Sequence, residues 1–321
     1  MYDILILYKQ TEMDKKNMSN KDRVEELTAL IDEKIDELIG SNDWKEYLKF
    51  ASAQYRYSWN NQFLIWFQSM MQGFDATMVK GYKQWQELGR TVKKGEKALY
   101  VLAPMIAHRC VQKECKGRVL YSRTSKTYTC PNDSRHQVGK FLTGFRDVAV
   151  FDVSQTDGEP IPVIELKDKC EGASKLIWDT LVSLADQNDF EVIIGNAKGA
   201  EGYCSHSEKK IVISDKKDFG YQVKILTHEI AHLLLHKDIT DYHQQRARYE
   251  TEAEGVAWVV CEALNIHSEG DNYSFGYIST WGKDNTKELV KKSLQNITKT
   301  SREILDHVET KLDRIEELAG V

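Results

Sequence analysis

Apolar residues recur every three or four positions from Lys21 to Ile39, and again from about Trp59 to Met71. This period predicts two amphipathic helices, and most aromatic side chains of the second are expected to lie in a core. A short helix is predicted within residues 77–97, followed by a strand at 98–102. The first third of the chain is therefore predicted to be mainly helical.

Short strands and longer helices alternate in the second half of the chain. A helix is predicted at about 171–187, strands at 190–195 and 210–214, and a final long helix at about 285–318. Runs of four to six apolar or β-branched residues are typical of short strands, whereas the 3.6-residue period is typical of helices. This mixture predicts an α+β fold.

A stretch rich in proline and glycine divides the two halves. Residues 153–163 contain two of the four prolines together with Gly158, a composition typical of a linker. The length of 321 residues is enough for two domains of about 150 residues each. We therefore predict one domain at residues 1–154 and a second at residues 163–321.

The sequence His228-Glu229-Ile230-Ala231-His232 lies in an apolar stretch without glycine or proline, which predicts a buried helix. Two histidines four residues apart share one helix face, with Cβ atoms about 5–6 Å apart. They can bind one Zn²⁺, and Glu229 is then placed to take a proton from a water bound by the metal. The two histidines can also be ordinary core residues.

A second helical stretch begins eighteen residues after His232 and offers the third ligand. Glu250 is the candidate ligand, and Glu254, one turn later, can orient a ligand histidine as a hydrogen-bond acceptor. Ala253 and Ala257 are small enough to let the two helices approach closely. Glu252 is expected to face away from the metal and to be solvated.

His236 continues the stripe of histidines but is not expected to bind the same ion. Eight residues of helix span about 12 Å, which is too far for one metal. The longer zinc-binding pattern of metzincins would need glycine and histidine where the chain has Leu235 and Asp238. We predict that His236 is a helix C-terminal residue favoured by the helix dipole.

The pattern His228-Glu229-x-x-His232 followed by Glu250-x-x-Ala253-Glu254 resembles the zincin metallopeptidases, in particular the ImmA/IrrE-like group. The resemblance implies a zinc-dependent peptidase in which Glu229 is catalytic. It also implies that residues 211–213 form an edge strand along which a peptide lies. Tyr277 and His243 are both candidates for the oxyanion donor, and the sequence does not choose between them.

Composition excludes a membrane protein and indicates a reducing compartment. The chain is 41% hydrophobic and 29% charged, and it has no run of 18 apolar residues. Residues 1–8 are too short and lack the basic lead of a signal peptide. We therefore expect a cytoplasmic protein whose six cysteines are thiols or metal ligands.

Positive charge is concentrated between Ala76 and Arg146. This segment has 15 Lys and Arg against 4 Asp and Glu, a net charge of +11, whereas the whole chain carries −5. Six aromatic residues, Tyr82 and Trp85 among them, are interleaved with the cations. Cations and aromatic faces together are what single-stranded nucleic acid binding requires, although a solvated basic surface explains the charge equally well.

Several short motifs in this region look like the single-stranded-DNA-binding domain of ArdC-type antirestriction proteins. They are residues 57–62, 81–85, 89–97 and 150–156, and the resemblance covers most of residues 45–315. ArdC-type proteins carry this domain ahead of a zincin-like domain, which is the order found here. The DNA contacts that the resemblance implies are Trp59, Asn60, Lys80, Tyr82, Lys83, Trp85, Arg90, Lys93, Lys94 and Lys97.

The chain departs from this family at about residues 106–140, which have the character of an insertion. Cys110 and Cys115, and then Cys130 and His136, flank a stretch predicted to be a β-hairpin. This is a loose zinc-ribbon pattern and predicts a possible second, structural zinc. Reduced thiols on the surface of a basic hairpin are the alternative.

Three functions are compatible with these features. The first is an antirestriction-type protein of a mobile element that binds single-stranded DNA and carries a zinc peptidase-like domain, with a protein or peptide as its second partner. The second is a regulatory zinc metalloprotease that cleaves a repressor or partner protein and uses the basic domain only to reach DNA. The third is a non-enzymatic DNA-coating protein with a structural zinc, against which Glu229 argues.

Overall fold

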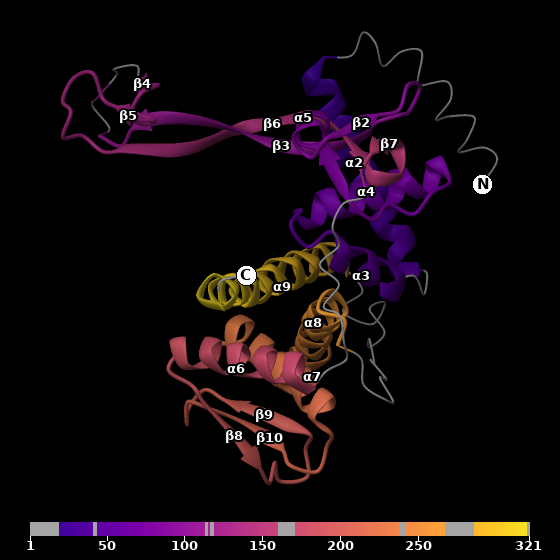
Figure 1. Ribbon diagram of the computed structural model, residues 1–321, viewed down its shortest axis with the longest axis vertical. Coiled ribbons are helices and arrows are strands. Elements are labelled where there is room, and N and C mark those ends of the chain that lie inside the picture. The colour runs from indigo at the N-terminus through magenta and orange to yellow at the C-terminus, as the bar shows by residue number, and fades with distance from the viewer. Residues whose placement is uncertain are drawn as a thin grey trace. The chain divides into compact units, whose positions relative to one another are not determined.

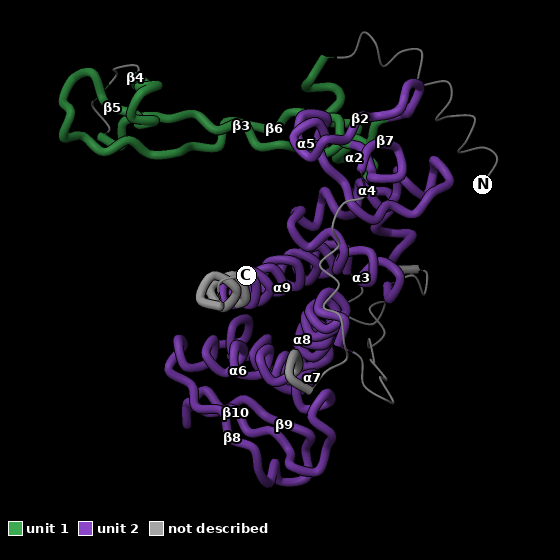
Figure 2. Tube along the Cα trace, in the orientation of Figure 1, with its two compact units in different colours: residues 1–30, 98–150 green, residues 31–97, 151–321 purple. Residues whose placement is uncertain are grey.

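The structure is a computed structural model that describes residues 19–40, 44–112, 115, 119–159, 171–237, 242–266 and 286–319 (Figure 1). Helices and strands are mixed along the chain, which confirms the predicted α+β class. The chain divides into two compact units, residues 1–30 with 98–150 and residues 31–97 with 151–321 (Figure 2). Among the described helices, none is long and apolar enough to cross a bilayer.

Unit 1 consists mainly of a long antiparallel β-ribbon. Strands β3 (Leu99–Cys110) and β6 (Val138–Asp152) pair from Leu99 opposite Val150 to Cys110 opposite Val138. The predicted strand at 98–102 is therefore confirmed but is longer than expected. Pairing continues into the segment predicted to be an insertion, with a register shift between Met105 and Ile106.

A second, shorter hairpin lies at the far end of this ribbon (Figure 1). Its strands β4 (Leu120–Ser122) and β5 (Thr127–Thr129) pair antiparallel, with Tyr121 opposite Tyr128. This confirms the hairpin predicted between Gly117 and Thr129. The side chains are exposed on both strands, so the hairpin has little apolar core of its own.

Helices α2 (Asn20–Gly40), α3 (Trp44–Ala53) and α4 (Trp59–Gln72) precede the ribbon. The first and third confirm the predicted helices almost to the residue, because the apolar period in both is regular. Phe63 and Phe67 of α4 are buried, as expected for its aromatic residues.

The lysines at 93, 94 and 97 belong to one turn of unit 2, called here the basic turn. A compact frame of short elements holds this turn. Its elements are β1 (Val79–Gly81), α5 (Tyr82–Glu87), β2 (Arg90–Val92), η2 (Val153–Gln155) and β7 (Thr156–Gly158). The fully buried Asp152 carboxylate accepts hydrogen bonds from the backbone amides of Thr77 and Met78 at 2.7 and 2.9 Å. The Gln155 amide donates to Lys97 O at 2.8 Å. The Gln155 side chain therefore fixes the turn itself, and Asp152 fixes the backbone just before β1.

The rest of unit 2 contains a three-stranded sheet covered by helices. After α6 (Glu171–Gln187) come β8 (Glu191–Gly195), β9 (Gly202–Ser205) and β10 (Lys210–Ser214), in the spatial order β8-β10-β9. Strand β10 runs parallel to β8 and antiparallel to β9. Helices α6 and α7 (Phe219–Leu235) lie over this sheet (Figure 1).

The predicted edge strand at 211–213 is wrong, because β10 is the central strand and is paired on both sides. Its residues Ile211, Val212 and Ile213 are at most 5% exposed. A strand that is apolar on both faces is typical of the middle of a covered sheet. The edge strands are β8 and β9.

Helices α8 (Tyr242–Ala263) and α9 (Thr286–Ala319) complete unit 2. They pack against α3 and α4 within the same unit. The Thr298 hydroxyl donates to Gln62 Oε1 at 3.2 Å, and the Arg302 guanidinium donates to Tyr55 O at 3.0 Å. Early and late helices of the chain thus share one core, and the division at residues 154 and 163 stays a prediction about the sequence.

Candidate metal centre

Helix α7 carries the two histidines of the motif on one face. The Asp218 side chain caps the first turn by accepting a hydrogen bond of 2.9 Å from the Tyr221 backbone amide. Most of the helix is buried, because the sheet lies on one side and α8 on the other. The Nε2 atoms of His228 and His232 lie 3.0 Å apart, as four-residue spacing allows.

Glu250 of α8 completes a triangle of donor atoms. Its Oε2 atom lies 3.4 Å from His228 Nε2 and 3.5 Å from His232 Nε2. Ligands about 2.0–2.1 Å from a tetrahedral Zn²⁺ lie about 3.3 Å from one another. Two imidazoles and one carboxylate are also the donors of catalytic zinc sites that keep a fourth position open. The residues present therefore fit a zinc ion.

Small residues allow α8 to reach this position. Ala253 and Ala257 are fully buried where α8 packs against α7. On the other side of α8, a Cβ atom at Gly255 would lie only 2.6 Å from Ile297 Cδ1 of α9. Helix α8 is thus held closely between two helices, and its carboxylates are placed by backbone packing.

Glu254 orients the first histidine. Its Oε2 atom lies 3.1 Å from His228 Nδ1, on the side of the ring opposite the donor triangle. Because Nε2 faces the triangle, the ring proton is assigned to Nδ1, which donates to Glu254. A carboxylate in this position fixes both the tautomer and the direction of the ring.

A chain of two further side chains orients the second histidine. His232 Nδ1 lies 2.8 Å from His236 Nδ1, and His236 Nε2 lies 3.4 Å from Glu252 Oε2. With His232 Nε2 in the triangle, its Nδ1 proton donates to His236, which then donates from Nε2 to Glu252. His236 is the C-terminal cap residue of α7, which confirms its predicted place, but sequence reasoning missed this contact.

The predicted solvation of Glu252 is wrong. Its side chain is fully buried and accepts hydrogen bonds from Ser293 at 2.6 Å, Asn296 at 2.9 Å and Arg248 at 2.9 Å. Burial raises the pKa of Glu252, but these donors and His236 outweigh burial and lower it to about 2. The prediction failed because α9, far away in sequence, covers this face of α8.

Glu229 lies beside the donor triangle and is only 6% exposed. Burial raises its pKa to about 7, and the charge of Glu250 adds to the effect. A Cβ atom at Gly202 would lie 3.1 Å from Glu229 Oε1 and 2.5 Å from Ile225 Cγ2, so β9 needs glycine here. A carboxyl group with this pKa can both take and release a proton near neutral pH.

The two histidines hold protons unequally. Burial lowers the pKa of His232 to about 4. Burial also disfavours the charged form of His228, but hydrogen bonds with Glu250 and Glu254 outweigh it and raise the pKa to about 10. A metal ion would therefore have to displace a proton from His228, which couples metal affinity to pH.

A cleft of about 730 Å³ opens over the donor triangle. Gly202, Tyr203 and Cys204 of β9 line one side, and α7 and α8 line the other. This volume is typical of a binding site for a small molecule or a few peptide residues. The predicted oxyanion donors, Tyr277 and the His243 side chain, lie outside the described residues.

The ten predicted DNA contacts differ in exposure. The exposed residues are Tyr82, Lys83, Lys93, Lys94 and Lys97. Trp59, Asn60 and Lys80 are half-buried, and Trp85 and Arg90 are buried. Most of the exposed cations belong to the turn between β2 and β3, where the Lys93 ammonium donates to Ser154 O at 2.8 Å.

Trp85 and Arg90 have structural roles in place of the predicted DNA contacts. The Trp85 ring is fully buried, and its Nε1 proton donates to Phe151 O at 2.9 Å. The Arg90 guanidinium donates to Thr156 Oγ1 at 2.8 Å and to Gly158 O at 3.0 Å. Neither side chain is exposed enough to contact a base, whereas the Tyr82 ring is 47% exposed.

A second group of predicted ligands also comes together, in unit 1. The donor atoms of Cys110, Cys115, Cys130 and His136 all lie within 4.8 Å of one another. Of the other cysteines expected to be packed thiols, Cys261 is buried and Cys204 is partly exposed, while Cys170 lies outside the described residues.

Two family models match the chain, one to each half. The N-terminal domain of anti-restriction factor ArdC matches residues 21–145, and the IrrE N-terminal-like domain of the M78 peptidases matches residues 189–263. These two matches, in this order, correspond to an ArdC-type architecture. All three donors of the triangle lie within the IrrE-like match.

Individual relatives are distant. The chain is 23% identical over 294 residues to the uncharacterized protein pXO2-81 of Bacillus anthracis, across 85% of this chain and 49% of that protein, so it spans about half of that relative's length. The metal-free crystal structure of the antirestriction ArdC protein from plasmid R388 covers 79% of this chain and 86% of its own, with a TM-score of 0.47 and 16% identity. The Mn(II)-bound structure of the same protein has a TM-score of 0.42 and 17% identity, across 79% of this chain and 88% of that one.

Proposed function

We propose that this ArdC-type chain binds single-stranded DNA through its N-terminal part and hydrolyses peptide bonds at a zinc centre in its C-terminal part. The observation that carries the second claim is the triangle of His228, His232 and Glu250 with the buried Glu229 beside it. A structural zinc site has no need of an additional buried carboxylate or of an open cleft.

His228, His232 and Glu250 would hold the zinc ion. The bound ion supplies Lewis acidity, which polarises a carbonyl oxygen and lowers the pKa of a water. Glu229 takes a proton from the attacking water and delivers it to the leaving amine, a role for which a pKa of about 7 is suitable. Glu254 and His236 keep the two imidazole rings turned toward the ion.

The edge strand β9 is the proposed docking site for the peptide. It pairs with β10 on one side only, and three of its residues line the cleft beside Glu229. An extended peptide can add to such an edge through main-chain hydrogen bonds, which give affinity without requiring one particular sequence. This placement brings a peptide bond close to the proton acceptor, because a Cβ atom at Gly202 would lie only 3.1 Å from Glu229 Oε1.

The single-strand-binding claim rests on the exposed basic turn of unit 2. Lys93 and Lys94 are exposed on a turn that Gln155 holds in place, and Tyr82 is an exposed aromatic ring in the same frame. Cations provide salt-dependent affinity for phosphates, and an aromatic ring provides stacking that tolerates any base.

The substitution Glu229→Gln tests the peptidase. It keeps the shape of the side chain but removes the proton acceptor, so we expect unchanged zinc content and a loss of about 10²–10⁴-fold in hydrolysis of a mixture of quenched fluorescent peptides. His228→Ala should lose both zinc and hydrolysis. Glu208→Gln, which changes an exposed carboxylate of the same sheet region, is the matched control.

Two results would contradict the peptidase. One is a Glu229→Gln protein that retains full hydrolysis, and the other is a zinc-loaded natural protein that cleaves no peptide in the mixture. In the second case the centre would hold the fold without catalysing hydrolysis, and the chain would act through DNA binding alone.

A further inference from the structure

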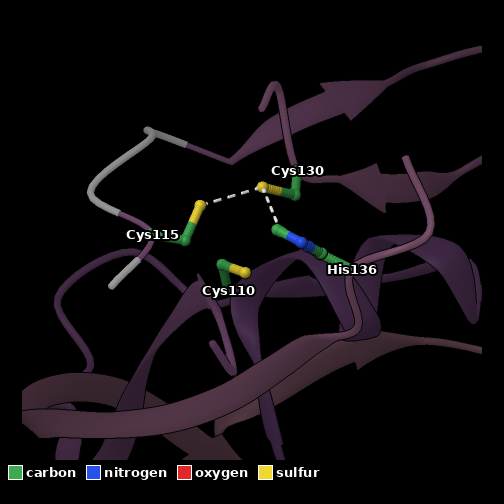
Figure 3. Close-up of side chains that lie close together, drawn as sticks. All are labelled: Cys110, Cys115, Cys130 and His136. Atoms are coloured by element: carbon green, nitrogen blue, oxygen red, sulfur yellow. Dashed lines mark hydrogen bonds between the residues drawn. The ribbon is translucent and has the colours of Figure 1, made fainter. Parts of the chain in front are cut away.

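We propose that Cys110, Cys115, Cys130 and His136 bind a structural zinc ion at the end of the β3–β6 ribbon. The four side chains come from two segments and converge on one space (Figure 3). All four donor atoms lie within 4.8 Å of one another. This centre lies in unit 1, shares no residue with the His228 centre and has a different donor set.

The backbone around the four residues is ordered by its own hydrogen bonds. The ladder ends with Cys110 opposite Val138, and the Val111 amide extends it by donating to Gln137 O at 3.0 Å. The Cys115 amide closes a turn onto Gln112 O, also at 3.0 Å, and the His136 amide closes another onto Asp133 O at 3.1 Å. Each segment thus presents two ligands, as in zinc ribbons.

The separations fit a shared metal and not a disulfide. Cys115 Sγ and Cys130 Sγ lie 3.2 Å apart, whereas a disulfide bond is about 2.05 Å long. Cys130 Sγ lies 3.7 Å from His136 Nδ1. Sulfur at about 2.3 Å and nitrogen at about 2.0–2.1 Å from a tetrahedral Zn²⁺ are about 3.6 Å apart, so this pair is spaced as two ligands of one ion.

Neighbouring side chains orient the ligands. His136 turns Nδ1 toward Cys130 Sγ, and its Nε2 lies 3.9 Å from Asp133 Oδ2, near enough for the carboxylate to attract the ring but too far for a hydrogen bond. Asp133 is itself fixed by Arg135, which donates to it at 2.8 and 3.1 Å. The Asn132 amide donates to Cys115 Sγ at 3.2 Å, a contact that stabilises a thiolate.

The end of the ribbon buries little apolar surface among its described residues. Leu120, Tyr121 and Val111 are 50–57% exposed, and the rings of His108, Tyr128 and Tyr121 contact one another. Cys130 is nevertheless only 3% exposed, and its Sγ atom contacts Cys115 Sγ and His136 Nδ1. A segment of this size cannot bury enough apolar surface to fold alone, and small domains of this kind commonly depend on a metal.

Donor chemistry selects the metal. Three thiolates and one imidazole are soft ligands that favour zinc and disfavour magnesium, calcium and manganese. The His228 centre, with two imidazoles and a carboxylate, accepts a wider range of divalent ions. Cobalt(II), which replaces zinc in tetrahedral sites, therefore reports on the two centres differently, because only a thiolate ligand produces a sulfur-to-cobalt charge-transfer band.

The test is a cobalt titration of the full-length protein, stripped of metal and kept under a reducing agent. We expect a sulfur-to-cobalt band that saturates within two equivalents, because the His228 centre also takes cobalt, and that is bleached when zinc is added. The band should disappear in the double substitution Cys115→Ser/Cys130→Ser. It should persist in Cys261→Ala, the matched control in which a buried cysteine outside the cluster is changed.

A second set of variants separates this proposal from the His228 centre. The band should persist in His228→Ala/His232→Ala, because those residues supply no sulfur, and zinc content should fall by one equivalent in each double variant. The proposal is overturned if the natural protein gives no charge-transfer band, or if the band survives Cys115→Ser/Cys130→Ser.

Limited proteolysis gives a readout that does not depend on a spectrum. With zinc bound, the ribbon end should resist cleavage at Arg123 and Lys126, and a chelator should expose both sites. Cys115→Ser/Cys130→Ser should be cleaved there even with zinc present. Identical cleavage patterns with and without zinc would count against a structural metal.

Discussion

Glu252 supports the metal centre although its position in the helix predicts a side chain that faces away from it. Two residues along a helix from Glu250, it points away from the donor triangle, yet it anchors His236 and through it His232. Its carboxylate meets donors from α8 and from α9 at once. A residue of this kind affects the geometry of the centre and the stability of the fold together.

We predict that Glu252→Gln makes the unfolding free energy of the protein less dependent on pH below pH ~5. The pKa of Glu252 is about 2 in the folded protein, whereas an unfolded glutamate has a pKa of about 4.3. The folded state is therefore stabilised by the carboxylate above pH ~5, and this stabilisation is lost as the pH falls toward 2. The natural protein should exceed the variant in unfolding free energy near neutral pH, by about 3–5 kcal/mol if the part-buried Arg248 charge is left unpaired.

Urea unfolding at a series of pH values measures this difference. The gap between the natural protein and Glu252→Gln should narrow steadily below pH ~5. The exposed Glu303→Gln on α9 should show no gap at any pH. A gap that stays constant down to pH ~2 would mean that the carboxylate charge is not what stabilises the fold.

Residue-level predictions from the sequence succeeded where local spacing decides and failed where a distant element decides. His228, His232 and Glu250 come together because two four-residue spacings and one close helix pair are sufficient to bring them there. The burial of Trp85 and Arg90 depends on residues 151–158, more than sixty positions away. No period in the sequence of either segment reveals that contact.

Among the elements, strand β9 is the one that borders the cleft. It is an edge of the sheet, and Gly202 lets it approach α7. The family resemblance implied an edge at 211–213, although three consecutive apolar residues are typical of a central strand. Strand order depends on pairing across the sheet, which a single strand's sequence specifies only in part.

Gly202→Ala is predicted to damage the centre through β9. The added methyl group would lie 2.5 Å from Ile225 Cγ2 and 3.1 Å from Glu229 Oε1, and Ile225 is branched and buried, so it cannot turn aside easily. We expect a stability loss of about 1–3 kcal/mol and a fall in peptide hydrolysis. Zinc content should be unchanged, because no ligand of the ion is displaced.

A matched glycine separates this effect from a general loss of backbone freedom. Gly195 ends strand β8 in the same sheet, and a methyl group there would contact nothing within 4 Å. Gly195→Ala should therefore leave hydrolysis and thermal stability near those of the natural protein. Equal behaviour of the two variants would show that close approach at Gly202 is not required.

On the scale of the whole chain, charge is distributed in blocks. The segment from Ala76 to Arg146 carries a net charge of +11 in a chain whose total is −5. Its cations fall in both compact units, with Lys93 and Lys94 on the turn of unit 2. The overall pI of about 6.0 conceals this block.

Lys93→Ala/Lys94→Ala is predicted to weaken binding to single-stranded oligonucleotides and to flatten its dependence on salt. Each phosphate that the turn no longer neutralises should reduce the slope of log K against log salt concentration by about 0.7. A salt titration followed by fluorescence anisotropy measures the slope. The control is Lys216→Ala/Lys217→Ala, which removes the same charge from another exposed pair of neighbouring lysines. It should keep the salt slope of the natural protein. Equal slopes for both variants would exclude the turn as a binding surface for DNA.

The sequence predicted the class of fold and both family matches, but not how the chain is partitioned in space. The predicted boundary near residue 154 follows composition, since proline and glycine mark a linker. Packing follows a different rule, because α3 and α4 bury their apolar faces against α8 and α9, which come much later in the chain. The apolar period of a helix predicts that one of its faces is buried, but it does not predict which element covers that face.

That shared helical core has an evolutionary consequence. The helix that supplies Glu250 and Glu254 also supports Tyr47 and Leu48 through Val259 on another of its sides. The IrrE-like part is consequently not independent of the early helices. A gene fusion that transferred it without those helices would expose apolar side chains, so recombination should preserve the two parts as a pair.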